Sequence, residues 1–83
     1  MNDPEMSRLR WRCRRGMKEL DMLLLAFVDS SYDESGLIGQ QAFRRLLSMP
    51  DPDILALLTG KLITDDKHLA NVIERLLARD RTA

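Results

Sequence analysis

The stretch MKELDMLLLAFVD, residues 17–29, decides the fold class. Its apolar residues recur at the spacing of one helical face, which is formed by Met17, Leu20, Leu24, Phe27 and Val28. Three more apolar side chains, Met22, Leu23 and Leu25, extend the apolar surface nearly all round the helix. This pattern is typical of a helix that is covered by its neighbours. The stretch therefore predicts a central, buried helix.

A shorter helix is predicted before this stretch. Asn2 or Asp3 can cap it, with Pro4 at the first helical position, where a missing N–H costs nothing. Its apolar stripe consists of Met6, Leu9 and Cys13. Gly16 then suits either the left-handed residue that ends this helix or the cap that opens the next one.

A third helix is expected after residues 30–39, which are rich in serine, aspartate and glycine. It begins between Gly36 and Gln40. It ends at Met49, because the residue before Pro50 avoids the helical region of backbone conformation.

Two more helices complete the chain. Asp51 is predicted to cap a fourth helix over residues 54–59, which Gly60 ends. Asp65 or Asp66 caps the fifth, whose apolar face is formed by Leu69, Val72, Ile73, Leu76 and Leu77. No segment alternates with the period of a strand. The sequence therefore predicts an all-α fold, a compact five-helix bundle.

Length and composition favour one soluble domain over residues 1–83. At 9.6 kDa the chain buries only ~60–65% of the surface that its unfolded form exposes, so it has one modest core. A single cysteine, Cys13, cannot form an internal disulfide and suits a reducing compartment. The longest apolar run, residues 22–28, is too short to cross a bilayer. Residues 1–5 lack the features of a secretory signal or a mitochondrial transit peptide, so we expect a cytoplasmic protein without membrane insertion.

The charge is balanced in total but uneven along the chain. Thirteen basic and thirteen acidic residues give a formal net charge of zero, which argues against a dedicated nucleic-acid-binding module. Residues 1–20 hold six basic side chains against three acidic ones, whereas residues 21–60 hold two against six. A basic end beside an acidic middle indicates an oriented encounter with a partner.

Catalytic and metal-binding chemistry is not indicated. Cys13 and His68 lie far apart in sequence, and neither belongs to a cluster with the spacing of metal ligands. Cys13 is better interpreted as a small buried thiol, and His68 as a surface residue. Residues 36–39 lack the lysine and the preceding strand of a phosphate-binding loop.

Trp11 is the most informative side chain of the first helix. At helical spacing it points to the side that Arg8, Arg12 and Arg15 share, opposite the apolar stripe. Tryptophan and arginine are enriched at binding hot spots. The alternative is that Trp11 packs on a second neighbour within the bundle and the arginines form a solvated face.

Gly16 and Glu19 also allow two interpretations. If Gly16 caps the second helix, Glu19 stands at its third position and bonds backbone N–H groups there. Alternatively, Gly16 lets a partner approach the helix junction closely. Arg15 then offers a hydrogen-bond donor and Glu19 an acceptor on either side of it.

Residues 14–21, RRGMKELD, contain Arg15, Gly16 and Glu19 in the order RGxxE. This string resembles the signature of the succinate dehydrogenase assembly factors that promote flavinylation. The resemblance continues at Trp11, Cys13, Phe27, Tyr32-Asp33, Phe43, Leu46-Leu47 and Asp51-Pro52-Asp53. The absence of a transit peptide resembles the bacterial form of the family.

The resemblance implies a chaperone-like assembly factor without an active site of its own. Family members are five-helix proteins that bind the flavoprotein subunit of succinate dehydrogenase and, in bacteria, also that of fumarate reductase. They assist covalent attachment of FAD to a histidine of that subunit, so the modified histidine is not His68. The implied docking residues are Arg15, Gly16 and Glu19, to which the physical argument adds Trp11 and Arg14. We expect a monomer that binds no cofactor stably.

Two rival functions use the same residues. A small helical nucleic-acid-binding module would use the Arg8–Arg15 face, with Trp11 stacking on bases. A free-standing FAD binder would need a phosphate cradle, which the sequence does not offer.

Overall fold

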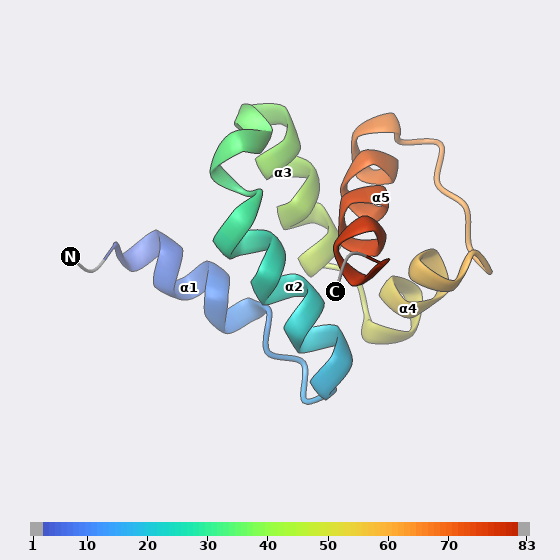
Figure 1. Ribbon diagram of the computed structural model, residues 1–83, viewed down its shortest axis with the longest axis horizontal. Helices are drawn as coiled ribbons and strands as arrows, with labels where there is room; N and C mark the ends of the chain where they lie inside the picture. Colours follow the sequence, from blue (N-terminus) through green and yellow to red (C-terminus); the bar gives the residue numbers. More distant parts are fainter. Residues whose placement is uncertain (1–2, 82–83) are drawn as a thin grey trace.

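The computed structural model describes residues 3–81, and side chains up to residue 78. The elements are α1 (Pro4–Arg12), α2 (Lys18–Ser30), a 3₁₀ turn η1 (Asp33–Ser35), α3 (Gly36–Leu47), α4 (Asp51–Thr59) and α5 (Lys67–Arg81) (Figure 1). No strand occurs within residues 3–81. The prediction of an all-α, five-helix fold is confirmed.

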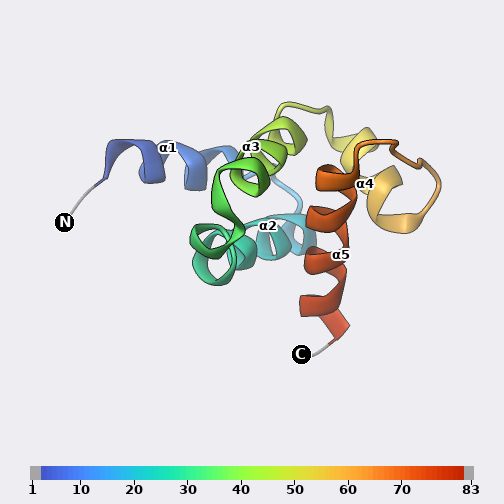
Figure 2. The same cartoon turned by 90° about the horizontal axis from the view of Figure 1, so that it is seen from above.

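The helices α2, α3 and α5 form the body of the molecule. Helix α5 packs most closely against α3 and then against α2, and it also contacts α4. In both views α1 and α4 lie at opposite sides of this body, and Figure 2 shows α1 running away from it. The molecule is accordingly elongated, with extents of 39 × 27 × 26 Å. One face of α1 is therefore covered by the body, and the rest is open.

The core contains side chains from all five helices. Phe27 stacks on Phe43 with 4.5 Å between the ring centroids, and Tyr32 meets Phe43 edge-on at 5.9 Å. Around these rings lie Leu9, Cys13, Leu20, Leu24, Val28, Ala42, Leu46, Leu47, Ile54, Leu57, Leu69, Val72, Ile73 and Leu76. Leu9 and Cys13 join α1 to this core, because both are buried.

The predicted helix starts are confirmed at two helices. The carboxylate of Asp3 accepts the N–H of Glu5 at 3.0 Å in front of Pro4. At α5 the carboxylate of Asp66 accepts the N–H groups of His68 and Leu69, at 3.0 and 3.1 Å. These bonds satisfy amides that have no partner within their own helix. The alternative cap Asn2 lies outside the described residues.

Two helix boundaries differ from the prediction. Helix α4 begins at Asp51, three residues early, because Pro50 with its extended backbone takes the cap position. Asp51 is therefore a first-turn residue and not a cap, which leaves its carboxylate available for other contacts. Helix α3 begins at Gly36, inside the predicted range, but ends at Leu47 and not at Met49.

The prediction that residues 17–29 form a helix buried nearly all round is wrong at two apolar positions. Met22 is 62% exposed, whereas Leu23 and Leu25 are partly buried against the core. Met17, predicted on the buried face, is also exposed because it precedes the helix as its cap. The number of apolar residues in a helix does not show whether all of its sides are covered by neighbouring helices.

None of the helices within residues 3–81 combines the length and the apolar character needed to span a bilayer.

Candidate functional site at the junction of α1 and α2

The linker between α1 and α2 turns at Gly16. Its φ angle is +81°, in the left-handed region that side chains other than glycine adopt at a cost. A Cβ built on Gly16 meets no atom of the described chain within 4 Å. The glycine is therefore required by the backbone and not by crowding, and the space beside it is open.

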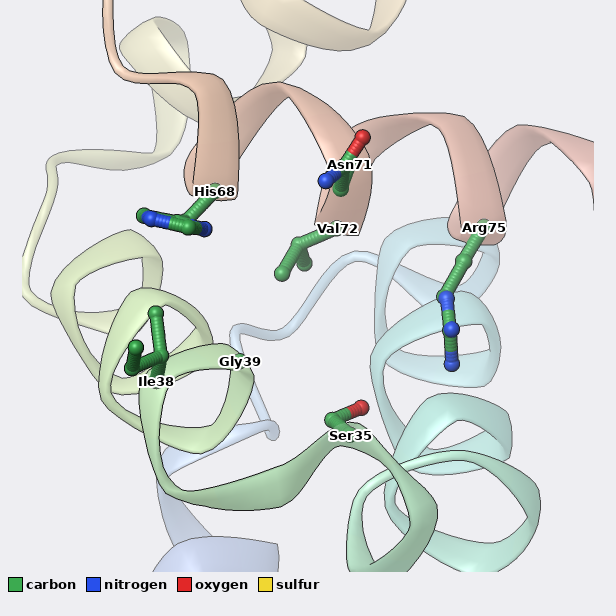
Figure 3. Close-up of a pocket in the computed structure, with 7 residues that line it drawn as sticks. All are labelled: Ser35, Ile38, Gly39, His68, Asn71, Val72 and Arg75. Carbon is green, nitrogen blue, oxygen red and sulfur yellow. The ribbon is translucent and has the colours of Figure 1, made fainter.

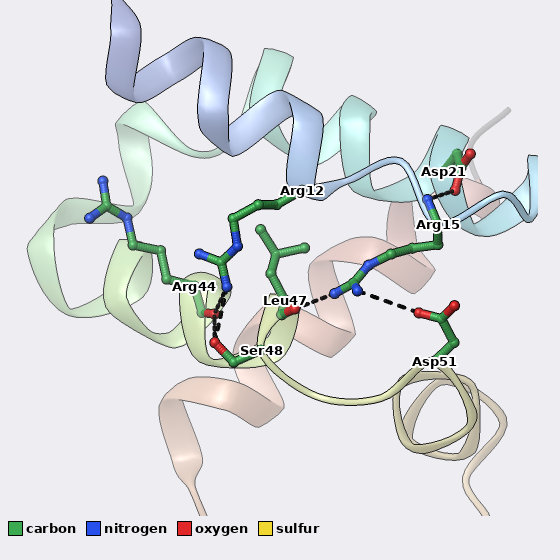
Figure 4. Close-up of polar contacts among 7 residues, drawn as sticks. All are labelled: Arg12, Arg15, Asp21, Arg44, Leu47, Ser48 and Asp51. Atoms are coloured by element: carbon green, nitrogen blue, oxygen red, sulfur yellow. Dashed lines mark hydrogen bonds and ion pairs between the residues drawn. The ribbon is translucent and has the colours of Figure 1, made fainter.

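Both the backbone and the side chain of Arg15 make polar contacts with other parts of the chain. Its backbone N–H donates to the carboxylate of Asp21 in α2 at 2.7 Å. Its guanidinium donates to the carbonyl oxygen of Leu47 and lies 3.5 Å from the carboxylate of Asp51 (Figure 4). The side chain is only 18% exposed, and within the described residues its Nε atom is buried without a hydrogen-bond partner. Arg15 therefore points into the molecule.

Glu19 points out of it. Met17 is the cap of α2, so Glu19 is the second helical residue and not the third. The interpretation of Glu19 as the partner of a Gly16 cap is therefore wrong. The residue is exposed, and its carboxylate makes no hydrogen bond or ion pair with the part of the chain that the structure describes. An acceptor in the first turn of α2 is thus available to another molecule.

Trp11 is 71% exposed, which excludes the interpretation that it packs on a neighbour within the bundle. With Arg10, Arg14, Leu25 and Ser7 it borders a depression of about 330 Å³ between α1 and α2. An exposed indole beside arginines is the composition found at the centres of protein–protein interfaces. Arg14 is exposed as well.

The predicted arginine face forms only in part. Helix α1 ends at Arg12, so Arg15 lies in the linker and not on the helix. Arg8 and Arg12 border a different depression together with Arg44. Arg12 also donates to the hydroxyl of Ser48 at 3.0 Å (Figure 4). Arg8 and Arg12 therefore stay together on α1, whereas Arg15 leaves the predicted face and Trp11 borders a different depression from theirs.

Cys13 is confirmed as a buried thiol. It is fully covered, and its Sγ atom donates to the carbonyl of Leu9 at 3.3 Å. Burial raises the pKa of the thiol to about 11 and outweighs the nearby arginines, of which Arg15 lowers it most. A thiol with so high a pKa is a poor nucleophile at neutral pH.

His68 is exposed near the start of α5, as predicted. It borders a shallow pocket of about 280 Å³ between α5 and the start of α3, whose other side chains are labelled in Figure 3. Within residues 3–81 no group of three or more His, Cys, Asp or Glu residues could hold a metal ion.

Sequence reasoning missed Asp21 and Asp51 as partners of Arg15. Asp21 lies six residues from Arg15, but a linker conformation is needed to bring the carboxylate to the amide. Asp51 was assigned to a helix cap, and no local spacing connects it with Arg15, because the contact joins segments 36 residues apart.

Comparison with known proteins identifies the chain. Residues 7–80 match the family described as flavinator of succinate dehydrogenase. A protein of Idiomarina loihiensis named FAD assembly factor SdhE is 47% identical over 72 residues, covering 87% of this chain and 80% of the relative. Proteins of the same name are 42% identical in Colwellia psychrerythraea, covering 88% of this chain and 80% of the relative, and 44% identical in Methylococcus capsulatus, covering 86% of each. No solved structure gives a significant match. The chain belongs to the flavinator of succinate dehydrogenase family.

Proposed function

We propose that this protein binds the flavoprotein subunit of succinate dehydrogenase and promotes covalent attachment of FAD to a histidine of that subunit. The flavoprotein subunit of fumarate reductase is proposed as a second partner. The name FAD assembly factor, borne by relatives that are up to 47% identical, supports the role. The observation that carries it is the open bend around Gly16, where a partner can approach the backbone closely.

The docking surface consists of Trp11, Arg14, Gly16 and Glu19, and we call it the junction surface. These residues follow one another along a single bend and are all exposed. The indole supplies apolar contact area, whereas Arg14 and Glu19 supply a donor and an acceptor of opposite charge. A surface of this mixed composition suits a complex that forms, acts and separates.

We propose that FAD is bound by the flavoprotein and not by this chain. The depression beside Trp11 measures about 330 Å³, at the low end of the range for small-molecule sites, which is roughly 300–1,000 Å³. The residues that border it include no glycine-rich phosphate loop. We propose that the flavoprotein holds the FAD and that the residues of this chain act on the flavoprotein.

Binding alone can promote the reaction. A helper that binds more tightly to the arrangement in which histidine and flavin meet raises the population of that arrangement by its differential affinity. Positioning of reacting groups has large effects on rate. No active site in this chain is needed. We propose that it acts as a monomer in the cytoplasm and without membrane insertion.

The proposal is tested with purified flavoprotein that lacks covalent flavin. The flavoprotein is incubated with free FAD, with or without this protein, and covalent flavin is read from the fluorescence of the denatured subunit. We expect faster labelling in its presence, and a loss of about tenfold or more for Glu19→Ala, as for a hot-spot residue. Asp53→Ala is the matched control, because Asp53 is an exposed acid in the first turn of α4. Equal labelling with and without the protein would refute the proposal.

A further inference from the structure

The inward direction of Arg15 changes the role that its motif suggests. We propose that Arg15 is a positioning residue, which together with Asp51 holds the linker of α1 and α2 against the corner between α3 and α4. In this arrangement Gly16 and Glu19 are presented to the flavoprotein. The role rests on the proposed function, but it assigns Arg15 to the support of the junction surface and adds Asp51 to that support.

The contacts of Arg15 join three elements. The backbone N–H binds the Asp21 carboxylate at 2.7 Å and ties the linker to the first turns of α2. The guanidinium binds the carbonyl of Leu47, the last residue of α3, and approaches the carboxylate of Asp51, the first residue of α4 (Figure 4). Gly16 is the next residue along the chain, so its position follows from these three contacts.

The guanidinium is not placed for a partner. The Arg15 side chain as a whole is only 18% exposed, and its buried Nε atom cannot be reached without moving the side chain. To bind the flavoprotein directly, Arg15 would have to give up the Leu47 carbonyl and leave the Asp51 carboxylate without its cation. Breaking a partly buried charged contact is costly.

A second contact fixes the same corner. Arg12, the last residue of α1, donates to the hydroxyl of Ser48 at 3.0 Å, directly after Leu47 in the chain. The end of α1 and the linker are therefore both anchored to the end of α3. Asp51 distinguishes a positioning role of Arg15 from direct docking. If Arg15 docked directly on the flavoprotein, Asp51 would have no part in flavinylation.

The experiment compares Asp51→Ala, Arg15→Ala and the double variant, with Asp53→Ala as control in the same turn of α4. Labelling rates are measured over a range of assembly-factor concentrations. If only a fraction of molecules holds the linker correctly, apparent affinity falls by that fraction while the maximal rate stays unchanged. We expect Asp51→Ala to raise the half-saturating concentration about tenfold, and the double variant to be no worse than Arg15→Ala, because coupled residues are not additive.

Amide hydrogen exchange of the protein alone gives an independent readout. In Asp51→Ala the amide of residue 15, which donates to Asp21, should exchange faster, whereas amides in α3 and α5 keep the rates of the parent protein. A merely destabilised fold would accelerate exchange in all helices.

Each outcome decides one question. The positioning role is overturned if exchange at residue 15 is unchanged in Asp51→Ala. It is also overturned if Asp51→Ala labels like the parent protein while Arg15→Ala loses labelling. If exchange is faster in Asp51→Ala but the parent protein never promotes labelling, the contact of Arg15 with Asp51 is supported and the proposed function is refuted.

Discussion

The linker between α1 and α2 and the linker between α4 and α5 each contain a glycine with a positive φ angle, but the residues around the two glycines differ. Gly16, between α1 and α2, and Gly60, between α4 and α5, both have a φ angle of +81°. In each case a Cβ would meet no described atom within 4 Å. At Gly60 the conformation ends α4, since Gly60 is its cap residue. At Gly16 it ends nothing, because α1 stops at Arg12 and Cys13 is its cap.

The side chains around the two glycines differ in what they serve. In residues 60–66 the Leu62 N–H donates to the Ala56 carbonyl of α4, and the Asp66 N–H to the Thr64 hydroxyl. The Asp66 carboxylate also binds Arg45 in α3 at 2.7 Å. Around Gly16, Arg15 is directed to distant elements, while Trp11 and Glu19 remain open. One glycine is thus explained by helix termination and the other by a surface that the chain itself leaves uncovered.

The largest expected effect separates the two glycines. Gly16→Arg and Gly60→Arg place the same side chain at the same φ angle in open space. Each should therefore lower the free energy of unfolding by a similar amount, about 1–2 kcal/mol, measured by thermal unfolding. Only Gly16→Arg should abolish covalent flavin labelling, because only there does the side chain occupy the junction surface.

The paired design guards against a trivial loss of fold. If both variants label the flavoprotein equally well at temperatures at which both are folded, the contrast between the linkers has no functional meaning.

A smaller effect is expected from the exposed apolar residues. Trp11→Ala should weaken binding to the flavoprotein about tenfold or more, as for a hot-spot aromatic, measured by titration calorimetry. Ile63, which is 84% exposed in the linker of α4 and α5, is its control. Ile63→Ala should bind like the parent protein, and a stronger loss at Ile63 than at Trp11 would move the docking surface to the other linker.

The smallest expected effect concerns Asp66, which caps α5 at the end of the linker between α4 and α5. The Leu69 N–H and, next, Arg45 hold the pKa of Asp66 below its ordinary value of about 3.9. A carboxyl with a lowered pKa in the folded state stabilises it above the unfolded value, and the contribution is lost as the pH falls through the folded value. The amide shift of Leu69 should therefore titrate below about pH 3.9 in NMR spectra. A titration midpoint of the Leu69 amide shift above about pH 3.9 would contradict this assignment. So would a titration that is seen in Asp66→Asn and is missing in the parent protein.

The sequence predicts the local features of the fold well. The amphipathic spacing of α5 and the caps Asp3 and Asp66 depend on residues within a few positions, and all three are confirmed. The exposure of Met22 was not predictable in this way, because it depends on whether another helix packs against that side of α2.

The sequence places Trp11, Arg14, Arg15, Gly16 and Glu19 at one junction, but it does not predict the directions of their side chains. Gly16 and Glu19 are open, as the docking interpretation requires, whereas Arg15 points inward. Helical spacing assigned Arg15 to a face of a helix that ends three residues before it. Where a side chain leaves a linker depends on tertiary partners such as Asp51, which no local pattern contains.

The covered thiol of Cys13 has a practical consequence. It is the chain's single cysteine and lies where the end of α1 meets the core. Alkylating reagents reach a covered sulfur only when the surrounding structure opens, so the rate of alkylation reports how often this part of the core opens. A flavoprotein that grips α1 would slow the reaction. If the proposed complex forms, the alkylation rate of the unmodified protein would report its formation and dissociation.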